Sequence, residues 1–197
     1  MELDDGASVD LRRDVADELS LDGGVDVALA DLDAARSTSE VRHARAVGLR
    51  YLNERPRSIK ELKDRLMRDD LSAEAIDEVV DEFIGLGYLD DDAFARVWAE
   101  SRATSRPKGR KLLFRELAQK GVDRDTVSQV IEDHYPPDSD LARRIAVQRA
   151  RSLGHLDRET FRRRLGGYLS RRGFDYGTIA PLLDDLWGEK VDGPGEP

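Results

Sequence analysis

The chain has 197 residues, no cysteine, 37% charged residues and a net charge of −9. The absence of cysteine excludes disulfides, thiol chemistry and cysteine-ligated zinc, and no apolar run approaches the ~20 residues of a membrane span. Because the acidic N-terminus is unlike a signal peptide, we expect a cytoplasmic protein.

Residues 1–40 carry the whole charge imbalance. They hold twelve Asp and Glu against three Arg, whereas the other 157 residues hold 29 of each sign. Without aromatic side chains and rich in Asp and Gly, this segment cannot bury enough apolar surface to offset the entropy of ordering. An acidic, disordered leader is therefore predicted, although apolar spacings near Val15 and Val25 allow a helix that forms on a partner.

Helical patterns begin after the leader and form a first unit. Residues 41–54 place apolar side chains on one helical stripe. Ser58 with Glu61 three positions later predicts a capping box at the start of a second helix. A third helix is predicted after Ser72, and the Gly85–Gly87 pair ends it.

The second unit repeats this order. A helix is predicted from the acidic run Asp90–Asp92, where the helix dipole favours negative side chains. Residues 110–120 form the next helix, and Asp123 caps a third helix that runs to His134.

The third unit is predicted to contain helices over 138–153 and 157–172, followed by a final helix to Trp187. Pro181 lies too deep for a helix that starts at Asp175. We therefore expect Thr178 to be the N-cap, which places Pro181 in the first turn where its missing N–H costs little.

One apolar ladder occurs in all three units with identical internal spacing and a period of 51 to 52 residues. Such a period indicates one structural unit used three times. The predicted fold is all-α, with three tandem three-helix repeats over 41–89, 90–137 and 138–187 in an elongated, curved array, and a flexible tail over 188–197. The ladder positions are Leu62, Leu66, Leu71, Ile76, Val80 and Phe83; Leu113, Leu117, Val122, Val127, Ile131 and His134; and Leu165, Leu169, Phe174, Ile179, Leu183 and Leu186.

Residues for catalysis do not converge in this pattern. The three histidines lie in different units, and His134 takes a ladder position, so we expect it to be packed and hydrogen-bonded. No P-loop, GxSxG or HExxH motif occurs. The run Asp90–Asp92 favours helix capping over a Mg²⁺ site. We therefore predict no enzyme, no cofactor and no metal, and we leave open whether Gly166–Gly167 permits a close backbone approach or a kink, or is sequence drift without a role.

A basic surface is predicted on the second and third units. Residues 102–120 hold seven bases and one acid, and residues 141–173 hold ten bases and two acids, whereas residues 69–95 hold ten acids and no base. Such a surface suits phosphates or an acidic protein groove. The candidate contacts are Arg102, Arg106, Lys108, Arg110, Lys111, Arg115, Arg143, Arg144, Arg162, Arg163, Arg164, Arg171 and Arg172.

Several short motifs between residues 41 and 187 form a recognisable pattern. They are Arg57-Ser58 with Glu61-Leu62 and Leu66, Gly87-Tyr88-Leu89-Asp90-Asp91 with Phe94-Ala95 and Trp98, Gly109, Glu116-Leu117 with Lys120-Gly121-Val122, and Arg171-Arg172-Gly173-Phe174. In these motifs the sequence resembles the RecX family, regulators of the bacterial recombinase RecA. It departs from the repeat at Asp70, which stands where the other units have Gly121 and Gly173, and the leader lies outside the resemblance.

The resemblance implies a non-enzymatic regulator that lies along the RecA–DNA filament. It would limit filament extension, ATP hydrolysis, strand exchange and coprotease activity, without a cofactor. The expected partner is the RecA filament, with single- or double-stranded DNA as a possible second partner and no membrane, and a monomer is expected. The alternative is an autonomous DNA-binding protein that uses its three-helix units as helix-turn-helix modules.

Overall fold

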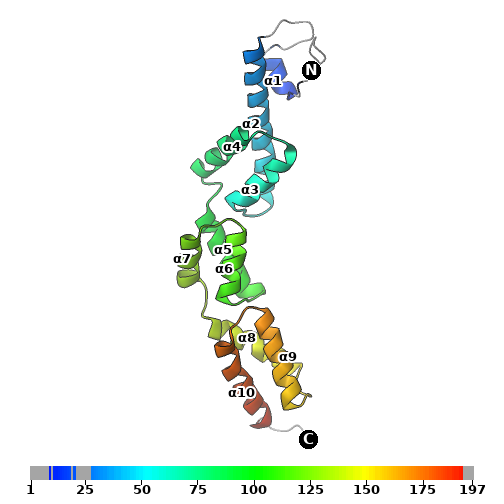
Figure 1. Ribbon diagram of the computed structural model, residues 1–197, viewed down its shortest axis with the longest axis vertical. Helices are drawn as coiled ribbons and strands as arrows, with labels where there is room; N and C mark the ends of the chain where they lie inside the picture. Colours follow the sequence, from blue (N-terminus) through cyan, green and yellow to red (C-terminus); the bar gives the residue numbers. More distant parts are fainter. Residues whose placement is uncertain (1–8, 10, 19, 21–27, 193–197) are drawn as a thin grey trace. The chain divides into compact units, whose positions relative to one another are not determined.

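The computed structural model describes residues 9, 11–18, 20 and 28–192. Ten α-helices and one short 3₁₀ helix occur in these residues, and no strand occurs among them, so the predicted all-α class is confirmed (Figure 1). The chain divides into two compact units, residues 1–91 and 92–197.

The first unit is a helical bundle with its own apolar core. Val47 of α2, Leu62 of α3 and Val80 of α4 are all buried in it. Each helix of the first predicted repeat therefore contributes at least one side chain to this core, as the prediction of a three-helix unit requires. The elements are α1 (Arg13–Glu18), α2 (Leu29–Glu54), α3 (Ile59–Leu66), the 3₁₀ helix η1 (Met67–Asp69) and α4 (Ala73–Gly85).

Helix α2 begins at Leu29, well before the predicted end of the disordered leader, so residues 29–40 are helical. Leu32 and Ala35 continue the buried stripe of α2 toward its N-terminus, and Val15 of α1 is buried as well. The backbone N–H of Arg12 donates to Ser39 Oγ at 2.6 Å. The early start of α2 follows from this packing against α1. The predicted leader residues 1–8, 10, 19 and 21–27 lie outside the described residues.

In the second unit, the second and third repeats share one core. Leu117 and Val127 from one repeat belong to the same buried cluster as Leu169 and Leu183 from the other. All ten ladder positions predicted as the repeat core (Leu62, Leu66, Ile76, Val80, Leu117, Val127, Ile131, Leu169, Ile179 and Leu183) are buried. The elements are α5 (Asp91–Ser105), α6 (Arg110–Gln119), α7 (Arg124–His134), α8 (Asp138–Arg151), α9 (Arg158–Arg171) and α10 (Tyr176–Asp192).

The predicted helix caps hold at three positions and fail at one. Ser58 and Glu61 form the capping box, and Ser72 and Asp123 accept hydrogen bonds from the first turns of α4 and α7. The prediction of Thr178 as a cap is wrong, because Asp175 Oδ1 accepts from the Thr178 N–H at 2.7 Å.

Helix α10 consequently contains Pro181 in its interior. Proline removes one backbone hydrogen bond there, but the helix buries Ile179, Leu182 and Leu183 around it. Burial of these side chains offsets the missing bond. The helix also continues to Asp192, so residues 188–192 of the predicted tail are helical, and residues 193–197 lie outside the described residues.

The prediction of a packed His134 is wrong, because its side chain is exposed. Helix α7 ends at His134, and the extended backbone of Tyr135 turns the next side chain inward instead. Tyr135 is 3% exposed, and its hydroxyl donates to the Lys108 carbonyl at 2.7 Å. Tyr135 therefore provides the buried side chain that was predicted for position 134.

The three repeats share a left-handed residue after the second helix. Gly121 and Gly173 have φ of 88° and 87°, and Asp70 has φ of 55°. Asp tolerates this conformation better than most side chains, because its short polar group hydrogen-bonds locally. The departure at Asp70 therefore preserves the turn.

Two glycines make the backbone contact between the second and third repeats. The Gly109 N–H donates to the Arg172 carbonyl at 2.8 Å. A Cβ atom on Gly109 would lie 2.3 Å from the carbonyl oxygen of Gly173, and one on Gly173 would lie 2.7 Å from Leu112 Cβ. Neither position has room for a side chain.

We expect Gly109→Ala to destabilise the second unit by about 3 kcal/mol, because the added methyl group collides with backbone that cannot rotate away. The midpoint of urea denaturation, followed by circular dichroism, measures this change. Gly188→Ala is the matched control, since a Cβ atom there meets nothing within 4 Å. A wild-type midpoint for Gly109→Ala would contradict the tight junction.

Candidate interaction surface

A groove lies between α6 and α7 in the second repeat. Its apolar floor comes from Phe114 and Ile131, and its rim carries four cationic side chains. Arg124 stacks over the Phe114 ring, with 5.6 Å between its guanidinium carbon and the ring centre. The lining residues are Arg110, Lys111, Phe114, Arg115, Arg124, Ser128 and Ile131.

A second groove lies between α9 and α10 in the third repeat. Phe174, Ile179 and Leu183 line it with apolar surface, and Tyr176 stands at its edge with 77% of its surface exposed. The lining residues are Arg162, Arg163, Gly166, Gly167, Ser170, Phe174, Tyr176, Ile179 and Leu183.

The two grooves occupy the same place in two repeats. The repeat shift aligns Lys111 with Arg163 and Ile131 with Leu183. It also aligns Phe114 with Gly166, so the aromatic side chain that lines the first groove has no counterpart in the second. A Cβ atom on Gly166 would lie 3.4 Å from Leu183 Cδ1 and thus point toward α10. Both grooves are open, with about 540 Å³ at α6–α7 and about 430 Å³ at α9–α10, and no backbone approaches Gly166 closely.

In the first repeat an ion pair spans the corresponding place. Lys63 and Asp77 align with Phe114 and Ser128 of the second repeat. Lys63 Nζ lies 2.6 Å from Asp77 Oδ1, which joins α3 to α4 across the position of the groove. The three repeats thus have the same helical arrangement but differ between their second and third helices, where the first has an ion pair and the other two have grooves.

Seven of the thirteen predicted contact residues are held by protein groups. Arg102 and Lys108 pair with Glu116, and Arg143 pairs with Asp185 and Glu189. The other four are Arg110, which binds Glu132 and the Tyr135 carbonyl, Arg144, which donates to the Ala103 carbonyl, Arg162, which pairs with Asp184, and Arg172, which donates to the Pro107 carbonyl. These seven cations connect elements of the second unit to one another.

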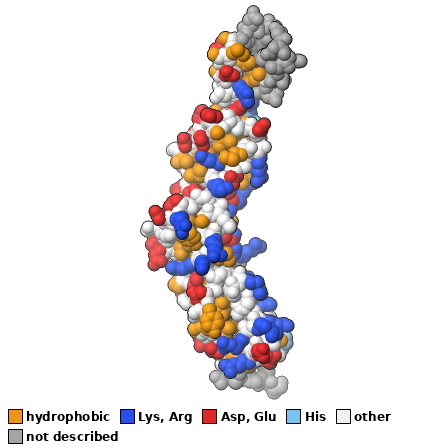
Figure 2. All heavy atoms as spheres, in the orientation of Figure 1, with side chains coloured by type: hydrophobic (Ala, Val, Ile, Leu, Met, Phe, Trp, Pro, Cys, Tyr) orange, Lys and Arg blue, Asp and Glu red, His pale blue; other side chains and the backbone are white. Residues whose placement is uncertain are grey.

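The other six are exposed, and within the described part of the chain no ion pair or hydrogen bond holds their side chains. Lys and Arg side chains spread over the visible face of α8 to α10 in Figure 2, beside apolar side chains. Cations without internal partners are free to bind an anionic partner. These six are Arg106, Lys111, Arg115, Arg163, Arg164 and Arg171.

Glu116 organises the polar contacts beside this surface. Its carboxylate accepts from Arg102 Nε at 2.9 Å and pairs with Lys108. The Trp98 indole N–H lies 3.4 Å from the same carboxylate. Burial by itself raises the pKa of the Glu116 carboxyl, but the hydrogen bonds from Lys108 and Arg102 hold that pKa below its ordinary value.

We expect Glu116→Gln to lower the free energy of unfolding by about 2 kcal/mol at pH 7, because it removes the charge from these hydrogen bonds. A lowered pKa stabilises the fold above the unfolded-state value of about 4.3, and this contribution is lost as pH falls through the folded pKa. The difference between wild type and variant should therefore vanish in acid.

Urea denaturation between pH 7 and pH 3 measures this difference. Glu132→Gln is the control, because the Glu132 side chain is 79% exposed and its pair with Arg110 contributes little. A Glu116→Gln effect that persists unchanged at pH 3 would contradict the charge-based explanation.

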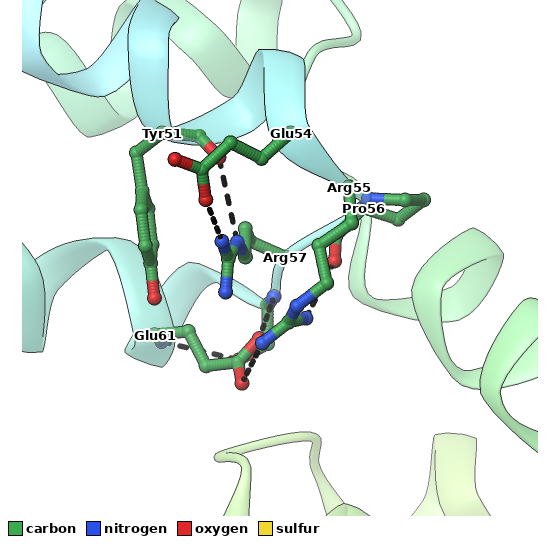
Figure 3. Close-up of polar contacts among 7 residues, drawn as sticks. Tyr51, Glu54, Arg55, Pro56, Arg57 and Glu61 are labelled. Atoms are coloured by element: carbon green, nitrogen blue, oxygen red, sulfur yellow. Dashed lines mark hydrogen bonds and ion pairs between the residues drawn. The ribbon is translucent and has the colours of Figure 1, made fainter.

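The turn between α2 and α3 explains one of the motifs that carry the resemblance (Figure 3). Arg57 stacks on the Tyr51 ring at 3.8 Å and pairs with Glu54 at 2.6 Å. Arg55 pairs with Glu61 at 3.1 Å, and Glu61 also receives the Ser58 N–H. With only 10% of its side chain exposed, Arg57 is a structural residue rather than a contact for a partner.

Helix α4 of the first unit presents the opposite charge. Glu74, Glu78 and Asp81 are exposed along α4. In the same unit Leu86 and Tyr88 are 57% and 56% exposed in the turn that follows this helix. The predicted charge polarity between 69–95 and the later repeats is therefore present at the surface.

The grooves include residues that were absent from the predicted contacts, among them Arg124 and Tyr176. Arg124 and Tyr176 occupy equivalent positions at the start of α7 and α10. Their shared place in the repeat is the signal that would have found them. In the portion of the chain described, no cluster of three or more His, Asp or Glu side chains is arranged to hold a metal ion. None of the helices described there combines the length and apolar character that crossing a bilayer requires.

Comparison with known proteins places these repeats in a family. Models of the first, second and third three-helix domains of RecX match residues 44–83, 90–131 and 138–183. The chain is 34% identical to the regulatory protein RecX of Corynebacterium efficiens, over 86% of this chain and 82% of the relative. It is 36% identical to the regulatory protein RecX of Thermobifida fusca, over 76% and 82%.

The fold is also that of a solved structure. A crystal structure of RecX from Lactobacillus salivarius matches with a TM-score of 0.65 and 21% identity, covering 76% of this chain and 97% of that one. Three matched domains in the expected order, together with two relatives above 30% identity, confirm the resemblance. The chain belongs to the RecX family of regulatory proteins.

Proposed function

We propose that this chain inhibits RecA by binding along the RecA–DNA filament, where it limits filament extension, ATP hydrolysis, strand exchange and coprotease activity. The proposal goes beyond the regulatory role that the family name gives. The observation that carries it is that six of the predicted contact cations are exposed and form no ion pair or hydrogen bond with the described residues, on a unit whose two repeats share a core. A rigid body with free cations suits an anionic partner that is itself extended.

The protein acts in this proposal by binding and without catalysis. Its strongest polar cluster, around Glu116, is occupied by Arg102, Lys108 and Trp98, which satisfy the carboxylate. A satisfied carboxylate at a lowered pKa is a poor general base, since it is ionised but weakly basic at neutral pH. The cluster fits a structural role.

Autonomous DNA binding is the second candidate, because unpaired cations also bind phosphates. The aromatic side chains argue against recognition of single strands by stacking. Tyr168 lies near the guanidinium groups of Arg149 at 5.5 Å and Arg172 at 4.6 Å, and Trp98 is covered by Arg102 at 4.3 Å. These ring faces are engaged within the protein, so bases would have to displace them.

Single-strand-DNA-dependent ATP hydrolysis by the cognate RecA tests the proposal. We expect this protein to inhibit hydrolysis at well below one molecule per RecA protomer. A chain lacking residues 1–28, which removes α1 and retains every residue of α2, measures what the acidic N-terminal segment adds. Tight, steeply salt-dependent binding to DNA without any effect on RecA would instead favour the autonomous DNA-binding function.

A further inference from the structure

We propose that the α9–α10 groove receives a bulky apolar side chain from an acidic segment of the partner protein. The inference rests on the proposed function, in that the RecA filament supplies the segment. It adds the place of contact and the chemistry of the segment that is bound.

The floor of the groove is suited to an apolar side chain. Ile179 and Leu183 from α10 face it together with Phe174, and all three are nearly buried beneath it. Gly166 adds no side chain to this floor, and the groove has a volume of about 430 Å³. An incoming apolar group would remove this surface from water, which is favourable in proportion to the area covered.

The second repeat carries an aromatic side chain at the corresponding position of its own groove. There the position of Gly166 is taken by Phe114, which lies between the two helices under Arg124. The chain thus supplies its own aromatic side chain in one repeat and leaves the equivalent place empty in the next. A partner's Phe, Leu or Met at the α9–α10 groove would complete the arrangement already present at α6–α7.

The charge around the groove selects an acidic segment. Arg163 lines the rim and is exposed, with no ion pair among the described residues. Arg164 and Arg171 are exposed on the same helix. No Asp or Glu lines the groove, and the nearby Asp184 is already paired with Arg158 and Arg162. A basic segment would be repelled here, whereas carboxylates beside the apolar anchor would meet free guanidinium groups.

Nucleic acid fits this place less well than a peptide. A phosphate backbone would contact the rim cations and leave the apolar floor uncovered, and Tyr176 offers the groove only one exposed ring. The first repeat, where Lys63 and Asp77 span the same position, has no equivalent opening. The second repeat has an open groove as well, but Phe114 takes the position of Gly166 there, so the two grooves differ in the apolar surface that they offer.

Gly166→Phe tests the inference by filling the groove with the side chain that the second repeat already carries. The probes are fluorescein-labelled, overlapping 15-residue peptides that span the cognate RecA, with binding measured by fluorescence anisotropy. We expect acidic peptides with a bulky apolar residue to bind wild-type protein, and Gly166→Phe to weaken that binding at least tenfold. Gly188→Phe, at a helix position where a Cβ atom meets nothing within 4 Å, should bind like wild type.

Arg163→Glu provides a second variant that leaves the core untouched, and it should weaken the same peptides while circular dichroism shows an unchanged fold. The inference is overturned if no acidic peptide binds, if the bound peptides are basic, or if both groove variants bind as tightly as wild type. Loss of DNA affinity in Gly166→Phe with no peptide binding would also overturn it, in favour of a nucleic-acid site.

Inhibition of RecA by the same variants separates this inference from the proposed function. Inhibition by wild type that Gly166→Phe and Arg163→Glu retain in full, with no peptide bound, overturns the groove and leaves the proposed function standing. Groove-dependent peptide binding without any effect of wild type on RecA supports the groove and overturns inhibition.

Discussion

Leu117→Asp is expected to unfold the entire second unit and leave the first unit folded. Leu117 is fully buried at the centre of a core to which both the second and third repeats contribute. Burying an unpaired carboxylate costs several kcal/mol, in addition to the lost packing of the leucine. That sum is comparable with the 5–15 kcal/mol that typically stabilises a domain.

Circular dichroism and amide hydrogen exchange measure this outcome. The helices over residues 92–192 should lose protection together, whereas those of the first unit, which has a separate core, should keep theirs. Val97→Asp introduces the same charge on α5 at a position that is 51% exposed, and it should melt like wild type. A Leu117→Asp variant with wild-type melting would show that the ladder is misplaced.

Arg163→Glu combined with Arg164→Glu is expected to raise the concentration needed for half-inhibition of RecA by about tenfold to a hundredfold. Both side chains are exposed on α9 without internal partners, so their replacement leaves the fold intact. Each reversal turns an attraction for an anionic surface into a repulsion of similar size. The effect should shrink at high salt, because exposed charges are screened over about 8 Å at physiological ionic strength.

Inhibition assays at two salt concentrations measure this effect, alongside thermal melting as a check of the fold. Arg50→Glu combined with Arg68→Glu is the matched control, since both residues are exposed in the first unit and the change in net charge is the same. Full inhibition by a folded Arg163/Arg164 variant would remove this part of the basic surface from the proposed function.

The sequence was sufficient to predict the helices and the core of the repeats. The ladder works because helical spacing decides which side chains face inward, and it placed Leu66, Leu117 and Leu169 in equivalent buried positions. It failed at His134, where the helix ends and the next residue turns inward instead. The end of the helix was predicted correctly, but a helical period does not show which side chain turns inward once the helix has ended.

Other features depend on contacts between elements that are distant in sequence. The start of α2 at Leu29 depends on packing against α1, which composition alone does not reveal. Arg102 and Arg163 have the same residue type, yet Glu116 from another helix holds the first and no described residue holds the second. The basic composition therefore predicted correctly that the surface is cationic. It could not distinguish the cations that pair with other protein groups from those without a partner among the described residues.

The glycine contact between Gly109 and Gly173 has a consequence for how a partner is matched. The shared core and the tightly packed backbone contact hold the α6–α7 and α9–α10 grooves at a constant separation. Two sites on a stiff body gain avidity only when the partner offers its own sites at the same interval. In the proposed function, a regularly repeating target would therefore bind the second unit most tightly when its own sites have this spacing, and any other target would bind through one groove at a time.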